Sequence, residues 1–173
     1  MKIMCKGFIL RPPKLSDLDS YYRNINDPFI GKNMRYITYP MSKPSVSSDL
    51  KKKIKMNSAK PKYMDIFVIC VGNECAGMIT LGEIIRDHKA WIGYWLGSDY
   101  RGKGIMTLAI KKITDYGFKR YKLRRIEASV ATFNKASTII LEKCGYKLEG
   151  TMKKNRLKNG KYYDEYLYAI TRP

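Results

Sequence analysis

The segment from Tyr94 to Ile113 constrains the fold more than any other part of the chain, because it predicts a strand, a glycine-containing loop and a helix in direct succession. The loop contains Gly102 and Gly104, and apolar side chains follow it at helical spacing. Glycines before a helix allow bare N–H groups to approach a ligand, and the helix N-terminus carries a partial positive charge. Such a loop favours a phosphate or a diphosphate as its ligand.

Two anion-binding motifs compete for this loop. The spacing from Gly97 to Lys103 fits the P-loop pattern G-x-x-x-x-G-K, but Gly104 follows where a P-loop has the Ser or Thr hydroxyl that holds magnesium. The second motif is R/Q-x-x-G-x-G/A. Arg101 and Gly104 match it, and Met106 departs from it by replacing the small last residue. The missing hydroxyl argues against the P-loop and favours the second motif.

With the longer string IGYWL…YRGKG-x-M-T, the segment resembles the acyl-CoA loop of the GNAT N-acetyltransferases. The likeness is to the branch with RimJ/RimL-type enzymes, which acetylate ribosomal-protein N-termini, and with spermidine acetyltransferases. The resemblance implies acetyl-CoA as cosubstrate and no metal. It assigns the following residues to acetyl-CoA binding: Trp95, Leu96, Arg101, Gly102, Lys103, Gly104, Ile105, Met106 and Thr107.

A second block, Asn134-x-x-Ser137 followed by Glu142 to Tyr146, resembles another conserved part of the same family. Taken alone, Asn134 is a helix cap and Ser137 an ordinary helix residue. Because the pair follows a strand after the glycine loop, we expect both to bind the CoA arm, as the resemblance implies. Many family members protonate the departing thiolate with a tyrosine at the position of Leu141, so we expect Ser137 to supply that proton here.

Acetyl transfer to an amine also requires a neutral nucleophile and stabilisation of charge on the thioester oxygen. A strand that splays from its neighbour around Leu96 could offer backbone N–H groups to the thioester oxygen and so stabilise its charge. Related sequences often carry a glutamate at the position of Trp91. The base is therefore expected to be Glu83, Glu127 or a water between them, although each carboxylate also fits an exposed strand residue or an ion-pair partner.

The 173 residues predict one GNAT domain over 1–173, of mixed α+β class. The expected fold is a central, mostly antiparallel twisted sheet of about six to seven strands flanked by about four helices. Strands are predicted at 8–10, 64–71, 75–83, 90–96, 126–130, 146–152 and 162–170. Helices are predicted from the cap Ser16, over 45–58, after Gly104, and from Asn134. The stretch 29–44 is expected to be an irregular loop.

The chain carries 34 Lys and Arg against 15 Asp and Glu, a net charge of +19. The electrostatic field of this charge favours acidic partners such as CoA phosphates, RNA or a ribosome, and it repels cations. An equal alternative is that the charge binds no partner and only keeps the protein soluble. No apolar run has membrane-spanning length and the N-terminus lacks a signal-peptide pattern, so a cytoplasmic protein without membrane contact is expected. A Gly72-Asn73 turn would place Cys70 and Cys75 opposite each other; two buried, reduced side chains are expected, with a cross-strand pair as the alternative.

Three functions follow. The first is an acetyl-CoA-dependent N-acetyltransferase that transfers acetyl directly to a primary amine, a protein N-terminal α-amine of ribosomal type. The second is a polyamine (spermidine or spermine) N-acetyltransferase. The third is a non-catalytic RNA- or ribosome-binding module on the same fold. The sequence leaves open the acceptor amine and the oligomeric state, a homodimer included.

Overall fold

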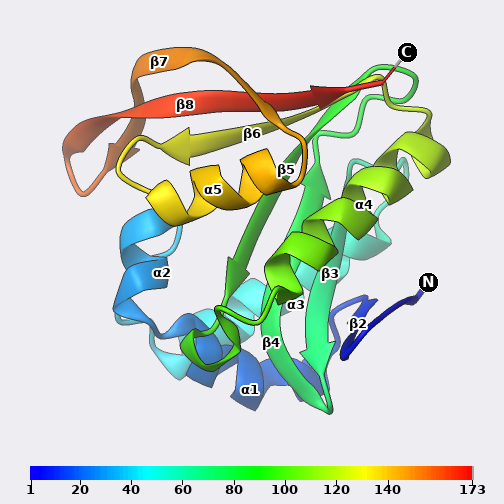
Figure 1. Cartoon of the computed structure of the whole chain (residues 1–173). Coiled ribbons are helices and arrows are strands. Elements are labelled where there is room, and N and C mark those ends of the chain that lie inside the picture. The colour runs from blue at the N-terminus through cyan, green and yellow to red at the C-terminus, as the bar shows by residue number, and fades with distance from the viewer. Residues whose placement is uncertain (173) are drawn as a thin grey trace.

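The computed structural model describes residues 1–172 as one twisted eight-stranded sheet with helices on both faces (Figure 1). The strand order is β1-β2-β3-β4-β5-β6-β8-β7, and every neighbouring pair is antiparallel except β5 and β6. The strands are β1 (Ile3–Cys5), β2 (Phe8–Arg11), β3 (Met64–Val71), β4 (Glu74–Gly82), β5 (Lys89–Leu96), β6 (Arg125–Ala131), β7 (Lys147–Lys158) and β8 (Lys161–Thr171). The α-helices are α1 (Leu18–Ile25), α2 (Pro28–Asn33), α3 (Lys43–Ser58), α4 (Ile105–Tyr121) and α5 (Lys135–Lys143). The predicted mixed class and mostly antiparallel sheet are confirmed.

Within residues 1–172 the structure has one strand and one helix more than the upper expectation. The additional strand, β1, is three residues long and pairs with β2, so it is too short to show an alternating pattern. The additional helix, α2, lies in the stretch predicted to be an irregular loop. Its N-cap is Asp27, whose Oδ1 accepts hydrogen bonds from the N–H groups of Phe29 (2.7 Å) and Ile30 (3.3 Å).

Two helices begin at other residues than predicted. Ser16 lies inside a short 3₁₀ turn, and α1 begins after Asp17, whose carboxylate forms a buried ion pair with Arg11 (2.6 Å). Ser45 is a residue of α3 itself, and the cap is Ser42, whose hydroxyl accepts a hydrogen bond from the Ser45 N–H (3.3 Å). In both regions several polar residues stand next to one another, and the pattern alone does not show which one begins the helix.

The sheet separates two hydrophobic cores, in keeping with the period-two alternation of its strands. One core lies under α4 and α5 and includes Ile92 and Leu96 of β5. The other lies under α1 and α3, where Trp95 stacks on Tyr21 with ring centroids 5.4 Å apart. Cys70 and Cys75 face each other across β3 and β4, and both are buried and free, as expected.

The parallel strands β5 and β6 part along most of their length. They pair only at Lys89↔Arg125, Ala90↔Ile126 and Trp91↔Glu127. Gly97 donates its N–H to the carbonyl of Ala76 on β4 (2.9 Å). Alternation along the strand therefore turns the backbone groups of Tyr94 and Leu96 toward the opening. The expected splay is present, and it begins already after Trp91 rather than around Leu96.

Candidate functional site

The glycine loop enters α4 through two residues in the left-handed backbone region. Gly102 has φ 74° and Gly104, the N-cap of α4, has φ 73°. A Cβ built at either residue would meet nothing within 4 Å. The backbone conformation, rather than lack of space, therefore requires glycine at these two positions.

This loop exposes a row of hydrogen-bond donors. Within the part of the chain that the structure describes, no backbone carbonyl or side chain accepts a hydrogen bond from the N–H groups of residues 102–107. The first hydrogen bond of the helix runs from the Leu108 N–H to the Gly104 carbonyl (3.1 Å). The Met106 side chain is buried in the core, so the residue that departs from the motif does not fill the loop. The predicted anion cradle is thus formed by backbone groups at the positive end of α4.

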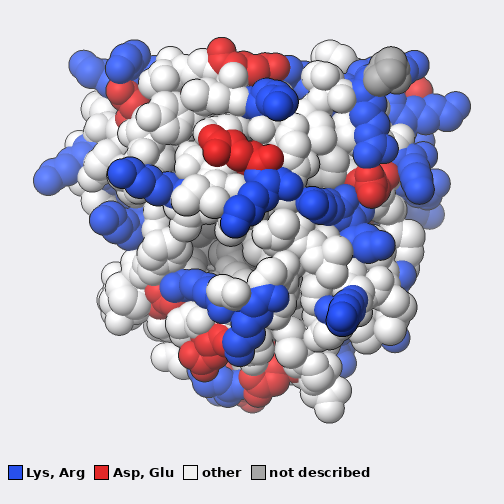
Figure 2. Space-filling model, in the orientation of Figure 1, with Lys and Arg blue, Asp and Glu red and all other residues white. Residues whose placement is uncertain are grey.

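Arg101 holds this loop against the rest of the protein. Its Nε donates to the Leu96 carbonyl (3.0 Å), and its guanidinium pairs with Asp27 (2.6 Å) and lies 4.5 Å from the centroid of the Phe29 ring. The side chain that was expected to attract an anion is therefore bound to β5 and α2. Lys103 is exposed. Figure 2 shows a hollow near the middle of the face that α4 and α5 cover, with Lys and Arg side chains on both sides of it.

A pair of hydroxyls bridges the open edge of β5. The Ser137 Oγ lies 2.7 Å from the Oη of Tyr94, and the side chain of Asn134 caps α5 by accepting from the Ser137 N–H (3.3 Å). Burial raises the pKa of Tyr94, which the hydrogen bond to Ser137 only partly offsets, so the phenol is protonated at neutral pH. Sequence reasoning missed Tyr94; strand alternation from the core residues Ile92 and Leu96 was the signal that places it on the α5 side.

The two predicted bases lie in different environments. Glu83 is exposed, has φ 48° and follows the last residue of β4, next to the closed end of β5 and β6. Glu127 lies at the last rung before the opening, 2.6 Å from Arg125 and 3.3 Å from Lys89. Burial alone would raise the pKa of Glu127, but the hydrogen bonds from these two cations outweigh it and lower the pKa. No contact joins either carboxylate to the Tyr94 hydroxyl.

Trp91 forms an apolar wall where related sequences often carry a glutamate. Its indole lies so close over the neighbouring strand positions that a Cβ at Gly82 would approach it to 2.4 Å and one at Gly93 to 2.8 Å. Both glycines are therefore required by this close approach. Trp91 supplies no carboxylate at that position, and the groups that bridge the opening are the hydroxyls of Tyr94 and Ser137.

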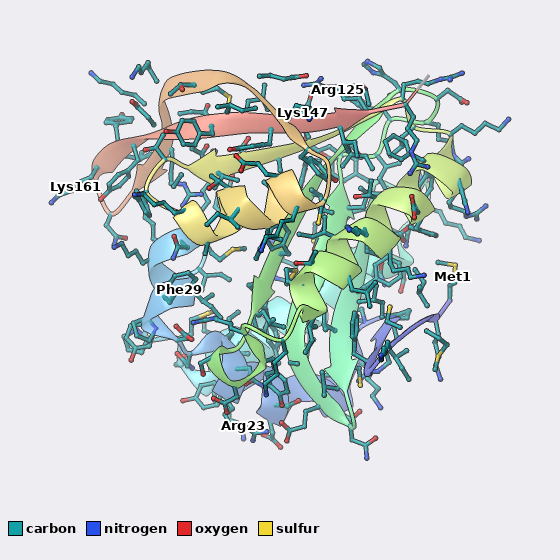
Figure 3. The ribbon with its side chains drawn as sticks, viewed as in Figure 1. Met1, Arg23, Phe29, Arg125, Lys147 and Lys161 are labelled. Carbon is teal, nitrogen blue, oxygen red and sulfur yellow. The ribbon has the colours of Figure 1, made fainter. Side chains whose placement is uncertain are left out.

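A cavity of about 240 Å³ lies between α2 and the loop that enters α5. It is lined by Phe29, Lys32, Asn33, Phe133, Asn134, Lys135 and Ala136. Figure 3 places Phe29 and the hairpin residue Lys161 on the same side of the molecule. Hydrogen bonds join α2 to the β7–β8 hairpin in agreement with this view, because Lys158 Nζ donates to the Gly31 carbonyl and Arg156 donates to the Asn33 carbonyl (2.7 Å).

A fully buried carboxylate anchors this hairpin. Glu165 accepts from Arg156 Nε (2.8 Å) and from the Asn155 amide (2.7 Å), and it pairs with Arg35. Two arginines therefore neutralise it.

Within residues 1–172, no group of three or more His, Cys, Asp or Glu side chains is placed to hold a metal ion, and no helix has the length and apolar character to cross a membrane.

Residues 8–147 match the family model described as acetyltransferase (GNAT) domain. The chain is 43% identical over 99 residues to probable N-acetyltransferase YjcK of Bacillus subtilis, covering 56% of this chain and 55% of that protein. It is 30% identical over 102 residues to the [ribosomal protein uS5]-alanine N-acetyltransferase of Escherichia coli, covering 58% of this chain and 53% of that protein. The matched part thus spans about half the length of these two relatives.

Two solved structures have the same fold. RimL, a ribosomal L7/L12 alpha-N-protein acetyltransferase in complex with coenzyme A, aligns with TM-score 0.88, 24% identity and coverage of 99% of this chain and 98% of that one. The microcin C7 self-immunity acetyltransferase MccE, in complex with acetyl-CoA and AMP, aligns with TM-score 0.86 and 28% identity, covering 97% and 94%. The family match over most of the chain and the shared fold place this protein in the GNAT acetyltransferase family.

Proposed function

We propose that this protein is an acetyl-CoA-dependent N-acetyltransferase that transfers acetyl directly to a primary amine. One observation carries the proposal. The open edge of β5 carries the hydroxyls of Tyr94 and Ser137, and the loop that follows this strand presents the free N–H groups of residues 102–107. A diphosphate fits the first feature and a thioester sulfur fits the second. The MccE structure, described as a complex with acetyl-CoA, supports the assignment of the cosubstrate.

The chain binds the cosubstrate mainly through its backbone in this proposal. Residues 102–107 hold the diphosphate, with Lys103 as the nearby free cation. The backbone groups of Tyr94 and the N–H of Leu96, which face the opening, receive the pantetheine arm in the manner of an added strand. Trp95 contributes by backbone position only, since its ring is buried against Tyr21 on the other face.

In the reaction, the amine forms a C–N bond to the thioester carbonyl as the C–S bond breaks. The electron pair of the C–S bond leaves on sulfur, and one proton leaves nitrogen. We assign to Ser137, backed by Tyr94, the donation of a proton to sulfur, and to the strand N–H groups the stabilisation of charge on the carbonyl oxygen. We assign the receipt of the nitrogen's proton, through water, to Glu127 at the last rung before the opening rather than to Glu83 on its exposed turn.

The acceptor that we propose is the N-terminal α-amine of a protein, of ribosomal type. The E. coli relative, described as acting on an alanine of ribosomal protein uS5, supports this choice. A polyamine needs free carboxylates, but Glu127 at the opening and Glu165 on the next strand, β8, are both paired with arginines. Ribosomes and acetyl-CoA are both cytoplasmic, and we propose that the enzyme acts there.

The test is incubation of the purified protein with labelled acetyl-CoA and a panel of peptides with free N-termini, beside spermidine and spermine. We expect label in one or more peptides and much less in the polyamines. Label in neither class, together with no acetyl-CoA binding by calorimetry, would leave the non-catalytic module as the better explanation. Transfer to spermidine alone would move the proposal to polyamine acetylation.

A further inference from the structure

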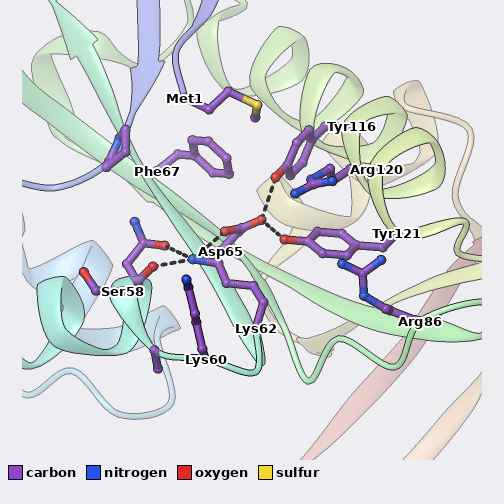
Figure 4. Close-up of a pocket in the computed structure, with 13 residues that line it drawn as sticks. Met1, Ser58, Lys60, Lys62, Asp65, Phe67, Arg86, Tyr116, Arg120 and Tyr121 are labelled. Carbon is purple, nitrogen blue, oxygen red and sulfur yellow. Dashed lines mark hydrogen bonds and ion pairs between the residues drawn. The ribbon is translucent and has the colours of Figure 1, made fainter.

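A second and larger cavity lies at the other end of α4 from the glycine loop. Its volume is about 440 Å³, which is in the range of small-molecule sites. It is lined by Met1, Pro12, Asn57, Ser58, Ala59, Lys60, Lys62, Asp65, Phe67, Arg86, Tyr116, Arg120 and Tyr121 (Figure 4). Because α4 has 17 residues, its two ends are separated by roughly 25 Å, and the two sites share no residue.

A buried carboxylate fixes the floor of this cavity. Asp65 is 6% exposed and accepts hydrogen bonds from the phenols of Tyr116 (2.7 Å) and Tyr121 (2.5 Å), and Lys62 Nζ lies 2.9 Å from its other oxygen. Figure 4 shows these groups converging on Asp65. The carboxylate is thus neutralised and holds two aromatic rings in fixed positions.

Three aromatic side chains form an apolar wall above this floor. The rings of Phe67 and Tyr116 meet edge to face with centroids 5.6 Å apart, and those of Tyr116 and Tyr121 do so at 5.9 Å. Phe67 and Tyr121 are each 3% exposed, whereas Tyr116 is half-buried, so Tyr116 offers the accessible ring surface of this wall.

The rim carries positive charge without counterions. The guanidiniums of Arg86 and Arg120 lie 5.2 Å and 5.9 Å from the centroid of the same ring, Tyr121, and Lys60 is exposed. Within residues 1–172, no carboxylate oxygen lies within 4.0 Å of these three cations. Figure 4 shows Arg86 and Arg120 on different sides of the Tyr121 ring, so each offers an unpaired cation to an anion at the rim.

We propose that this cavity binds a nucleoside monophosphate, with the phosphate at the rim that carries Arg86 and Arg120 and the base against Tyr116. An inorganic anion would leave most of the volume and the aromatic wall unused, and a cationic ligand would be repelled by the rim. The nucleotide can be free in solution or belong to a single-stranded RNA, since both present the same base and phosphate. This inference uses none of the residues of the proposed acetyltransferase site.

The test measures binding of AMP, GMP, a short single-stranded RNA and inorganic phosphate by calorimetry. The variants are the double substitution R86A/R120A, the control K51A/K52A on the exposed face of α3, and G104V, which disables the other anion site. We expect a nucleotide to bind the wild type, K51A/K52A and G104V alike, and inorganic phosphate to bind more weakly. Loss of each arginine should weaken binding about tenfold, so the double variant should bind very weakly.

The affinities of the four ligands for these variants distinguish an RNA site, a free-nucleotide site and binding at the glycine loop. An RNA that binds at least tenfold tighter than AMP assigns the cavity to RNA, and equal or weaker RNA binding assigns it to a free nucleotide. Binding that survives R86A/R120A but is lost in G104V would mean that nucleotides enter only the glycine loop, and the proposal would be wrong. It would also be wrong if no nucleotide or RNA bound, or if phosphate bound as well as AMP. Both arginines are exposed, so circular dichroism should show folded variants.

Discussion

The Oγ of Ser137 lies 2.7 Å from the phenol oxygen of Tyr94, so that α5 and β5 are joined by two hydroxyls across the edge where β5 has lost its strand partner. Neither residue belongs to a conventional acid–base pair with a carboxylate. The pKa of Tyr94 is raised by burial, so its proton remains available at neutral pH. These two oxygens therefore form the proton-donating unit of the proposed reaction.

Substitution of this pair should lower kcat. We expect Ser137→Ala and Tyr94→Phe each to reduce kcat by about 100-fold, the lower end of general-acid effects, with little change in the KM for acetyl-CoA. Because the residues act together, the double variant should lose little more than the Ser137→Ala variant. Steady-state kinetics provide the measurement, and Thr138→Ala on the same helix is the control. Unchanged kcat in both single variants would remove the pair from the mechanism.

Substitution of the glycine that caps α4 should abolish acetyl-CoA binding. Gly104→Val forces a β-branched residue into φ 73° and crowds the N–H groups of the loop. Gly160→Val in the β7–β8 turn is the matched control, because that glycine has the same φ and equally open surroundings. Calorimetric titration with acetyl-CoA should show binding only in the control. Equal affinity in the two variants would refute the proposed role of the loop.

The ion pair between Asp27 and Arg101 should matter for cosubstrate affinity. Asp27 both caps α2 and binds Arg101, whereas Asn at that position retains the capping oxygen and loses the charge. We therefore expect Asp27→Asn to raise the KM for acetyl-CoA about threefold to tenfold with little loss of stability, since a partly exposed pair contributes about 1 kcal/mol. If KM stays constant while the melting temperature falls, the pair serves α2 alone.

Removal of the buried carboxylate in the hairpin should destabilise the protein strongly. Glu165→Ala leaves Arg156, which is 5% exposed, without its partner, and we expect a loss of about 3 to 5 kcal/mol in the free energy of unfolding. Glu149→Ala, at an ion pair nearer the surface, should cost far less, because water screens that pair. Urea unfolding followed by circular dichroism measures both. Similar losses in the two variants would contradict this account of the anchor.

The paired carboxylate of Glu127 should make stability depend on acid pH. Its pKa is lowered from the ordinary value of 4.5, so the folded state holds the ionised form more favourably than the unfolded state does. The contribution is complete above pH 4.5 and disappears as the pH falls through the lowered value. We expect wild type to exceed Glu127→Gln by about 1 kcal/mol at pH 7 and to match it near pH 2. A difference that persists unchanged at pH 2 would argue for a packing effect.

The sequence predicted those parts of the protein that depend on local chemistry. The glycine loop and the Asn134 cap were visible because φ and capping preferences act within a few residues. Tyr94 was not singled out, because its partner Ser137 lies 43 positions away and only the fold brings them together. The environment of Glu127 was equally hidden, since Lys89 reaches it across the parallel rungs.

Because β5 and β6 pair at only three positions, the sheet consists of two parts: β1 to β5 form one part, and β6 to β8 form the other. A ligand that fills the opening as an extra strand would fasten the two parts together. Amide protons near Tyr94 should then exchange slowly only in the loaded enzyme, while those of the β3–β4 ladder exchange slowly throughout.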